Sequence, residues 1–580
     1  MNHTSGRFAR LGTALAPHGV GFALALAYVA LLVPTARTLG FARDEGFYFA
    51  ASTSYARWFD LLLRDRPAAL TRAAIDQAWG INHEHPALMK SLFGLSWLFL
   101  HERWHLIAQE SLAFRLPGML MAGLGLWLTY LFGFRATGHR RVGLVAAVLL
   151  GLIPRVFYHA HLDCFDVPVM TMWVAVLYCY WRSLAGGVAW ALATGVVWGL
   201  ALETKHNAWF VPILVVVHQI ATRGGDIGRD LRRGNLPLPL SLVCMAVLGP
   251  LIFWALWPWM WFDTLRNAGG GPGRLSEYVN FHFNHAYYNM EYLGYNWFRP
   301  PFPRSYAWGM IAFTVPTITL VLGALGMGLR VPGLLRDVGW IGRLVTPAKT
   351  ALGQRVRAFL DALPEPRPGT AGLMFLGFAV PLGPWLSTRT PIFGGTKHWF
   401  PAYPFLALFA GLGFLAVSRA MERALGDRVR RPWLPAAALA AVVFLPALTQ
   451  TTHSHPFGLS NYTPLVGGTP GAATVGLNRQ FWGFTTGSLA PYFNREAPPG
   501  AGIYIHDTTW DSWVMMQRDG TLRSDLRAVW QPVEAHFSIV HHELHMNEVD
   551  YQIWTAYQSP ATAQVLQHDG VPIVSVYRRP

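Results

Sequence analysis

The chain of 580 residues is poor in cysteine and in charge. Its three cysteines, Cys164, Cys179 and Cys244, all lie in or beside apolar segments. A disulfide framework and a cysteine-rich metal site are therefore excluded. Only 13% of the residues are charged whereas 52% are hydrophobic, which is too apolar for a series of soluble domains and typical of a membrane protein.

Acidic residues are also scarce relative to basic ones, and the net charge is +15. In a soluble protein this excess would suggest a nucleic-acid partner. Here the basic residues gather in short loops between apolar runs, as the positive-inside rule of membrane proteins describes. We therefore expect contacts with membrane lipids and no nucleic acid.

Long apolar runs are abundant. Crossing about 30 Å of hydrocarbon takes about 20 helical residues, so runs of this length predict membrane-spanning helices. Eleven candidates lie near residues 19–39, 114–134, 142–160, 166–183, 187–204, 207–222, 236–262, 306–329, 370–386, 398–418 and 433–450. The first follows Arg7 and Arg10 and is interpreted as an uncleaved signal anchor. The fold class predicted is an α-helical polytopic membrane protein.

The sidedness of the loops follows from their charge. With the N-terminus inside, every strongly basic short loop falls on the inner side. These loops hold Arg135, Arg140 and Arg141; Arg182; Arg223, Arg229, Arg232 and Arg233; the stretch from Arg330 to Arg367; and Arg419, Arg423, Arg428, Arg430 and Arg431. Residues 86–100 are too short for a span and contain Lys90, so they predict a juxtamembrane helix on the outer side.

Two domains are predicted. Residues 1–450 form a transmembrane module with a large outer loop at 40–113, and residues 451–580 form an outer domain. The second region contains strand-like runs at Gly502–His506, Phe537–His541 and Val571–Tyr577, with turn signals at Asp519-Gly520 and Asp569-Gly570. A small α/β or α+β domain is expected there.

Acidic and basic side chains gather at the predicted outer ends of the spans, where ionisable residues are costly and point to function. The five groups are Asp44 with Glu45; Glu84 and His85 with Lys90; His159 and His161 with Asp163 and Asp166; Glu203 and Lys205 with His206; and Arg389 with Lys397 and His398. Such a set at one membrane surface suits a reaction between a lipid-borne donor and an acceptor outside.

The order of these motifs resembles the GT-C class of membrane glycosyltransferases. The resemblance is carried by Asp44-Glu45 after the first span, by His-Pro-x-Leu-x-Lys at residues 85–90, by Phe-Arg-Leu-Pro at residues 114–117, and by Asp-x-Pro at residues 166–168. Most similar are the protein O-mannosyltransferases and the bacterial aminoarabinose transferases that act on lipid A. Ala87 and Met89 depart from the mannosyltransferase pattern.

The resemblance implies transfer of a sugar from a polyprenyl-phosphate donor to a hydroxyl of a protein, lipid or glycan. An inverting displacement needs a base for the acceptor, and Asp44 is the candidate, with Glu45 and Glu84 beside it. The departing lipid phosphate needs cations, which Lys205, Arg389 and Lys397 can supply. The remaining residues expected to bind substrate are His85, Lys90, Asp166, His206 and His398.

No cofactor is certain from these motifs. The acids, with His85 and His159, could hold a divalent ion; carboxylates favour Mg²⁺, Mn²⁺ or Ca²⁺, and imidazole shifts the preference toward Zn²⁺. The relatives imply a bacterial inner membrane, with the active site and the C-terminal domain facing the periplasm. Alternative functions are a polytopic transporter and a noncatalytic membrane scaffold.

Two further motifs are given structural interpretations. The sequence His-His-Glu-Leu-His at residues 541–545 is one residue short of the His-Glu-x-x-His zinc pattern, and a surface turn is expected. An aromatic run from Phe281 to Phe302 could stack on sugar rings, but a place in the headgroup layer is favoured.

Overall fold

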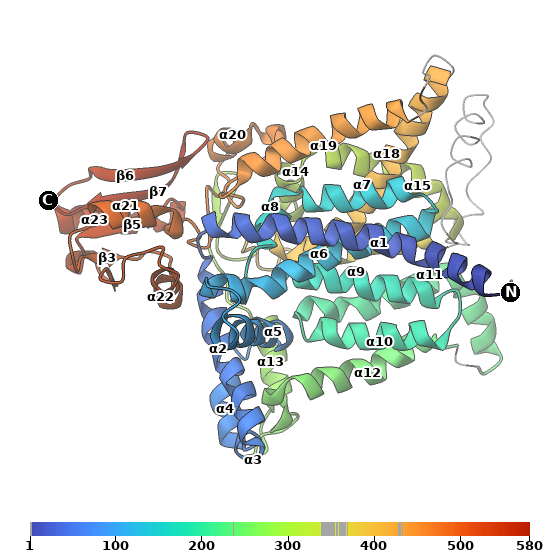
Figure 1. Ribbon diagram of the computed structural model, residues 1–580, viewed down its shortest axis with the longest axis horizontal. Helices are drawn as coiled ribbons and strands as arrows, with labels where there is room; N and C mark the ends of the chain where they lie inside the picture. The colour runs from blue at the N-terminus through green and yellow to red at the C-terminus, as the bar shows by residue number, and fades with distance from the viewer. Residues whose placement is uncertain are drawn as a thin grey trace.

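The computed structural model describes residues 3–235, 237–337, 369–426 and 433–580, with positions 354, 358, 367 and 431. Its helices lie side by side in one bundle (Figure 1). The N-terminus lies at one end of this bundle, and a domain containing a β-sheet lies at the other. The predicted fold class, a polytopic helical protein with a C-terminal sheet domain, is confirmed.

Within the described residues, five helical segments are long and apolar enough to cross a membrane, judged by length and composition. They are Ala16–Thr38, Glu110–Thr137, Thr317–Leu335, Lys397–Leu425 and Leu434–Ser454. Three shorter apolar helical segments are Val188–Leu202, Leu240–Leu256 and Thr370–Leu386. The multi-pass character is thus clear, while the number of eleven spans stays a prediction.

All eleven apolar runs are at least partly helical. Proline divides two of them, because it cannot donate the helical hydrogen bond: Pro154 begins a new helix after α7, and Pro316 separates α14 from α15. The bundle helices are α1 His3–Thr35, α6 Glu110–Thr137, α7 Arg140–Gly151, α8 Pro154–His159, α9 Asp166–Ser183, α10 Val188–Leu202, α11 Val211–Arg232, α12 Leu240–Leu256, α14 Tyr306–Thr314, α15 Thr317–Asp337, α17 Thr370–Ala379, α18 Tyr403–Leu425 and α19 Leu434–Ser454.

The loop after α1 folds into short helices at the end of the bundle near the sheet domain. These are α2 Arg43–Arg64, α3 Arg66–Ala69, α4 Arg72–Trp79 and α5 Leu88–Ser96, which continues as a π-helical turn, Trp97–Arg103. The helix expected within residues 86–100 is confirmed. Trp58 and Trp79 of this region share a buried cluster with Trp257, which follows α12.

A second long loop follows α12 at the same end. It contains α13 Arg274–Phe283 and an antiparallel hairpin of β1 Met290–Tyr292 and β2 Tyr295–Trp297. Before α18, the segment Lys397–Ala402 forms a 3₁₀ turn. These two segments carry side chains toward the pocket described below.

The C-terminal domain has a mixed five-stranded sheet in the order β4-β3-β5-β7-β6. β3 Gly502–Tyr504 pairs in parallel with β4 Arg527–Val529 and β5 Phe537–His541, and the antiparallel pairs join β5 to β7 and β6 to β7. The other elements are α20 Gly468–Thr474, α21 Ala490–Glu496, α22 Trp510–Arg518, α23 Asn547–Tyr557, β6 Thr562–His568 and β7 Val571–Arg578. The three predicted strands are present, and β4 and β6 are additions.

The sheet domain and the loop that follows α1 share one hydrophobic core. Phe49 of α2 and Met89 of α5 belong to the same buried cluster as Ile503 of β3 and Trp513 of α22. A Cβ on Gly46 of α2 would lie 2.0 Å from the Thr509 hydroxyl, so only glycine allows this close approach. The domain is therefore packed directly over the N-terminal end of α2.

Part of the predicted inner surface lies outside the described residues. This holds for most of the stretch between residues 330 and 367 and for Arg428 and Arg430. Arg135 and Arg140 are described at the junction of α6 and α7.

Candidate functional site

A pocket of about 640 Å³ lies between the helix ends and the C-terminal domain. This volume is in the range of small-molecule binding sites. It is lined by residues from all five groups that the sequence analysis singled out: Asp44, Glu84, His85, Asp166, Lys205, His206, Arg389, Lys397 and His398. Segments from across the chain thus meet at one concave surface.

Asp44 lies in the first turn of α2 and faces this pocket. Its Oδ2 accepts a hydrogen bond from Lys397 Nζ at 3.3 Å, and its side chain is 22% exposed. A carboxylate at a helix N-terminus is stabilised by the free N–H groups there. Asp44 is therefore held as a partly exposed carboxylate with two cationic neighbours, Lys397 and Arg43, whose Nε lies 3.9 Å from Asp44 Oδ1.

Glu45 does not line the pocket. Its carboxylate forms two hydrogen bonds of 2.8 Å with the Arg115 guanidinium, and both side chains are 1% exposed. It also accepts the backbone N–H groups of Ala42 at 2.9 Å and Asp163 at 3.0 Å. The residue expected to act in catalysis instead joins α2, α6 and the turn before α9.

A second buried ion pair lies on the pocket wall. Lys205 Nζ donates to Asp166 Oδ1 at 2.5 Å, and His159 Nδ1 is 3.3 Å from the other carboxylate oxygen. Burial lowers the pKa of Lys205, but the attraction and hydrogen bond of Asp166, together with the other nearby acidic groups, outweigh burial and raise the pKa overall. Lys205 is thus a permanent cation at this position.

Lys397 and Arg389 come from the loop before α18. The Lys397 ammonium lies 3.7 Å from the ring centre of Trp482, in a cation–π contact. Gly394, with φ +62°, lets the chain turn here, since a Cβ would lie 2.3 Å from Lys397 Cε. Arg389 is exposed at the pocket and makes no ion pair within the described part of the chain.

The segment before α5 places Glu84 and His85 on the pocket wall but keeps Lys90 away from it. Lys90 is fully buried and donates to the backbone oxygens of Asn82 at 2.5 Å and His85 at 2.9 Å. Burial lowers the pKa of Lys90 to about 7. These hydrogen bonds hold the turn at residues 82–85 in place. The Lys90 side chain, which was expected to bind substrate, does not line the pocket.

Histidines form much of the remaining wall. The rings of His206 and His282 lie 4.0 Å apart, and burial lowers the pKa of each, that of His282 to about 3. Burial and nearby cations also keep the pKa of His85 well below its usual value. These imidazoles are neutral at physiological pH, so each offers a donor and an acceptor. His282 was not among the predicted residues.

The C-terminal domain adds acidic residues that the sequence analysis missed. Asp507, which follows β3, and Glu543 and His545, which follow β5, all line the pocket. Arg43 binds Asp507 at 2.9 Å, and Gln480 donates to Glu543 at 2.9 Å. The predicted surface turn at 541–545 is therefore wrong, because the domain packs this turn against the pocket.

Burial changes the protonation of these two acids. It raises the pKa of Asp507, and it raises the pKa of Glu543 well above its ordinary value, with repulsion between the two carboxylates adding to the effect. Two nearby carboxylates in a poorly hydrated place favour the neutral form of one of them. Protonation at this end of the pocket is thus coupled between the two residues.

The aromatic run also contributes to the pocket. Phe281, Tyr287 and Tyr288 line it, together with His285, whose ring stacks on Phe393 at 4.7 Å. These three aromatic residues therefore form part of the pocket wall, and the headgroup position favoured for the run as a whole stays a prediction. Aromatic faces suit the apolar face of a sugar ring or a lipid chain.

Among the described residues, the acids of the pocket do not converge with the histidines into the divalent-ion site that the sequence left open. In the described ranges, one group of three potential ligands converges closely enough for a metal ion, His453 with His568 and Asp569, and it does not line the pocket. Asp44, Glu84 and Asp166 have separate partners, namely Lys397, Asn82 and Lys205.

Comparison with known proteins gives one family match. The model of the dolichyl-phosphate-mannose-protein mannosyltransferases matches residues 95–254, which include the Phe-Arg-Leu-Pro motif at 114–117, Asp166 and Lys205. No curated protein matches the chain.

Solved structures show a weaker similarity. The ArnT crystal structure from Cupriavidus metallidurans, bound to undecaprenyl phosphate, is 14% identical with a TM-score of 0.42, covering 97% of this chain and 98% of that one. The oligosaccharyltransferase of Archaeoglobus fulgidus in its apo form is 11% identical with a TM-score of 0.42, covering 91% and 71%. At this level neither likeness assigns a function. The family match confirms the resemblance to the GT-C class of membrane glycosyltransferases that the sequence motifs indicated.

Proposed function

We propose that this protein transfers a sugar from a polyprenyl-phosphate donor to a hydroxyl group of a protein, lipid or glycan acceptor. The observation that carries the proposal is the single pocket that joins Asp44 to the cations Lys205, Arg389 and Lys397. It combines an exposed carboxylate with positive charge, and the family match supports glycosyl transfer.

The cations suit the departing lipid phosphate. Arg389 is exposed and without an ion pair in the described residues, so it can bind phosphate oxygens at once. Lys205 and Lys397 are each paired with a carboxylate, and their charge acts on the phosphate from the buried side. Such fixed donors stabilise a developing anion because they need no reorganisation.

The reaction proceeds as one displacement at the anomeric carbon. The acceptor oxygen forms a bond to this carbon while the bond to the phosphate oxygen breaks, and the polyprenyl phosphate leaves with the electron pair. Asp44 receives the acceptor proton. Attack opposite the leaving group inverts the anomeric configuration.

The acceptor enters from the C-terminal domain. Asp507, Glu543 and His545 line the pocket opposite the bundle, and Asp507 is ion-paired with Arg43, the residue directly before Asp44. Neutral histidines and a protonated carboxyl group can hydrogen-bond sugar hydroxyls. Glu45 and Lys90 act as positioning residues, since neither reaches the pocket.

The membrane orientation is part of the proposal. The C-terminal domain lies at the bundle end opposite the N-terminus (Figure 1), and residues of this domain line the pocket. With basic loops inside, this end faces outward, which corresponds to the periplasmic side of a bacterial inner membrane. Clustering of the charges at one end supports transfer at a surface rather than transport through the bundle centre.

The test is the lipid composition of cells that lack the protein. One polyprenyl-phosphate sugar is expected to accumulate, and expression of the wild-type chain should restore its normal level. Expression of Arg389→Ala serves as a partial-loss variant, and Arg304→Ala, an arginine that does not line the pocket, is its matched control. An unchanged pool of all polyprenyl-phosphate sugars would contradict the proposal.

A further inference from the structure

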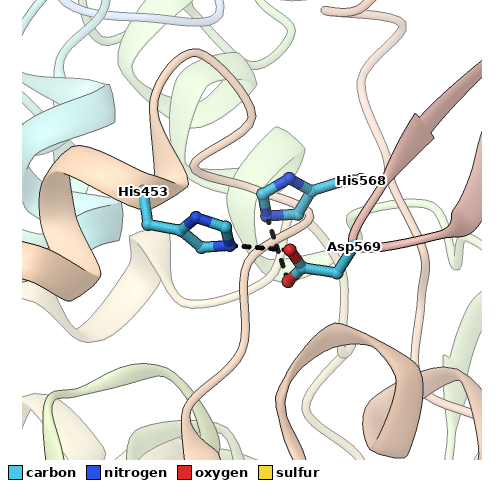
Figure 2. Close-up of side chains that lie close together, drawn as sticks. All are labelled: His453, His568 and Asp569. Atoms are coloured by element: carbon cyan, nitrogen blue, oxygen red, sulfur yellow. Dashed lines mark hydrogen bonds and ion pairs between the residues drawn. The ribbon is translucent and has the colours of Figure 1, made fainter.

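A second group of potential ligands lies at the junction of the bundle and the sheet domain. His453 is in the last turn of α19, and His568 and Asp569 are at the tip of the β6–β7 hairpin. His453 Nε2 is 2.7 Å from Asp569 Oδ1, and His568 Nε2 is 3.9 Å from Asp569 Oδ2. Figure 2 shows both imidazole rings directed toward the carboxylate.

In the part of the chain that the structure describes, the Nε2 atom of the buried histidine of this group has no hydrogen-bond partner. His568 is 6% exposed, and its Nε2, which faces Asp569, is buried without an acceptor or donor. Leaving a buried polar nitrogen unpaired costs about 1–3 kcal/mol, so a ligand for it is to be expected.

The backbone holds the carboxylate in place. Asp569 and Gly570 both have positive φ, +52° and +75°, and form a two-residue hairpin turn, with His568 paired to Val571. Hairpin geometry alone accounts for Asp at this position, since Asp tolerates positive φ. It does not account for the two histidines beside it, which come from different parts of the fold.

The separations fit a small transition-metal ion. The ligand atoms of all three residues lie within 4.8 Å of one another. A tetrahedral zinc ion with bonds of about 2.0–2.2 Å places its ligands roughly 3.4 Å apart, which small side-chain adjustments reach here. Two imidazoles with one carboxylate favour Zn²⁺ over Mg²⁺ or Ca²⁺, which prefer oxygen ligands.

We propose that His453, His568 and Asp569 bind a Zn²⁺ ion that fastens the C-terminal domain to the end of α19. A water molecule would be the fourth ligand. The site is separate from the pocket, as none of the three residues lines it. It would fix the far edge of the sheet, where β6 is the last strand, to the membrane bundle. The proposal is independent of the sugar-transfer reaction.

The test is a metal titration of the full-length protein in detergent, purified without a histidine tag and stripped with a chelator. Co²⁺ is the probe, because its visible absorption reports tetrahedral nitrogen and oxygen coordination, and Zn²⁺ is then added to displace it. The wild type should bind one more equivalent of Co²⁺ than His453→Ala, and Zn²⁺ should raise its melting temperature.

Two variants and one control make the result specific. His453 is exposed, so His453→Ala should fold, while Asp569→Asn retains a residue that accepts the positive φ of the turn. Each should lower the metal affinity by at least roughly 10- to 100-fold, the loss that even indirect ligand partners cause. His536→Ala removes an exposed histidine elsewhere in the same domain and should behave like the wild type.

Equal metal content and an equal Zn²⁺-dependent rise in melting temperature for the wild type, His453→Ala and Asp569→Asn would overturn the proposal. So would a wild type that binds no Co²⁺ at this site. In that case the His453 to Asp569 contact is an ordinary hydrogen bond between the two parts of the chain.

Discussion

Asp44 and Glu45 are adjacent in the sequence, but the structure uses them in opposite ways. The Asp44 side chain is 22% exposed and lies at the pocket, whereas that of Glu45 is 1% exposed and bound by Arg115. Consecutive residues of an α-helix point about 100° apart, so one faces the cavity while the next faces the neighbouring helices. In a pair of adjacent carboxylates, one residue can thus face the site of reaction while its neighbour stabilises the fold.

The surroundings of the two residues explain the division. Glu45 receives four hydrogen bonds that satisfy its carboxylate without water, two from Arg115 and two from backbone N–H groups. Within the described residues Asp44 accepts one hydrogen bond, from Lys397 to Oδ2, its Oδ1 lies 3.9 Å from Arg43 Nε, and the residue lines the pocket. A fully paired carboxylate is a poor base, whereas a partly exposed one can accept a proton.

The largest expected effect is on turnover when Asp44 is changed. Asp44→Asn preserves the size of the side chain but cannot accept the acceptor proton, so sugar transfer should fall by about 10²- to 10⁴-fold. Donor affinity should stay near that of the wild type. The measurement is the transfer rate of the purified variant, with donor binding measured separately. Full turnover by a folded variant would remove Asp44 from its proposed role, and equal losses of binding and turnover would make it a ligand of the donor.

The next effect is on stability when the Glu45 pair is broken. Removing one partner of a buried ion pair costs about 3–5 kcal/mol, because the other charge is left unpaired. Arg115→Met should therefore lower the melting temperature strongly, and Glu45→Gln should lower it as well. Asp44→Asn is the matched control and should melt near the wild type. If Asp44→Asn and Glu45→Gln destabilised the protein equally, the division between the two neighbours would be incorrect.

A smaller effect is expected on donor binding when a cation is removed. Alanine at Lys205, Arg389 or Lys397 should weaken donor binding by about 1.5–3 kcal/mol, the range for a hydrogen bond to a charged group. Arg389→Lys should recover part of the loss, since the charge remains but the two-pronged geometry does not. Titration with a soluble, short-chain polyprenyl phosphate measures this. Unchanged affinity for all three alanine variants would place the phosphate elsewhere.

The smallest effect concerns pH and the acids of the C-terminal domain. The folded protein holds a proton on Glu543 above the pH at which the unfolded chain releases it, since burial raises the pKa. Its contribution to stability therefore falls as pH rises above the ordinary glutamate value of about 4.3. Glu543→Gln should stabilise the protein relative to the wild type at pH 7 and lose this advantage near pH 4. The measurement is the melting temperature of both proteins as a function of pH. If the two melting temperatures changed in parallel between pH 4 and pH 7, Glu543 would not titrate in this way.

Much of the bundle could be predicted from the sequence because apolar length alone indicates membrane helices. The residues expected to act in catalysis or to bind substrate also line one pocket, apart from Glu45 and Lys90. Those two exceptions could not be foreseen, because the motif gives their order along the chain and not the direction of each side chain. Arg115, which binds Glu45, lies in the Phe-Arg-Leu-Pro motif at residues 114–117. The spacing of the motifs along the chain does not indicate that these two residues form a pair.

The contribution of the C-terminal domain was hidden for a different reason. Asp507, Glu543 and His545 reach the pocket only because the domain packs over α2, and local sequence patterns do not indicate how two domains dock. One sequence feature could have indicated this contribution. The run His-His-Glu-Leu-His at residues 541–545 places four ionisable side chains at the end of the buried strand β5, which is unusual for a plain surface turn. β6 was missed because its residues Thr562–His568 are mostly exposed at the sheet edge.

The most direct test of the account is the release of polyprenyl phosphate by the purified wild-type protein. A synthetic polyprenyl-phosphate sugar, chosen as the lipid that accumulates in cells lacking the protein, is incubated with the protein and an acceptor extract. The account predicts release of polyprenyl phosphate together with a new glycoside of inverted anomeric configuration. Binding of the donor without any release, or a product of retained configuration, would contradict it.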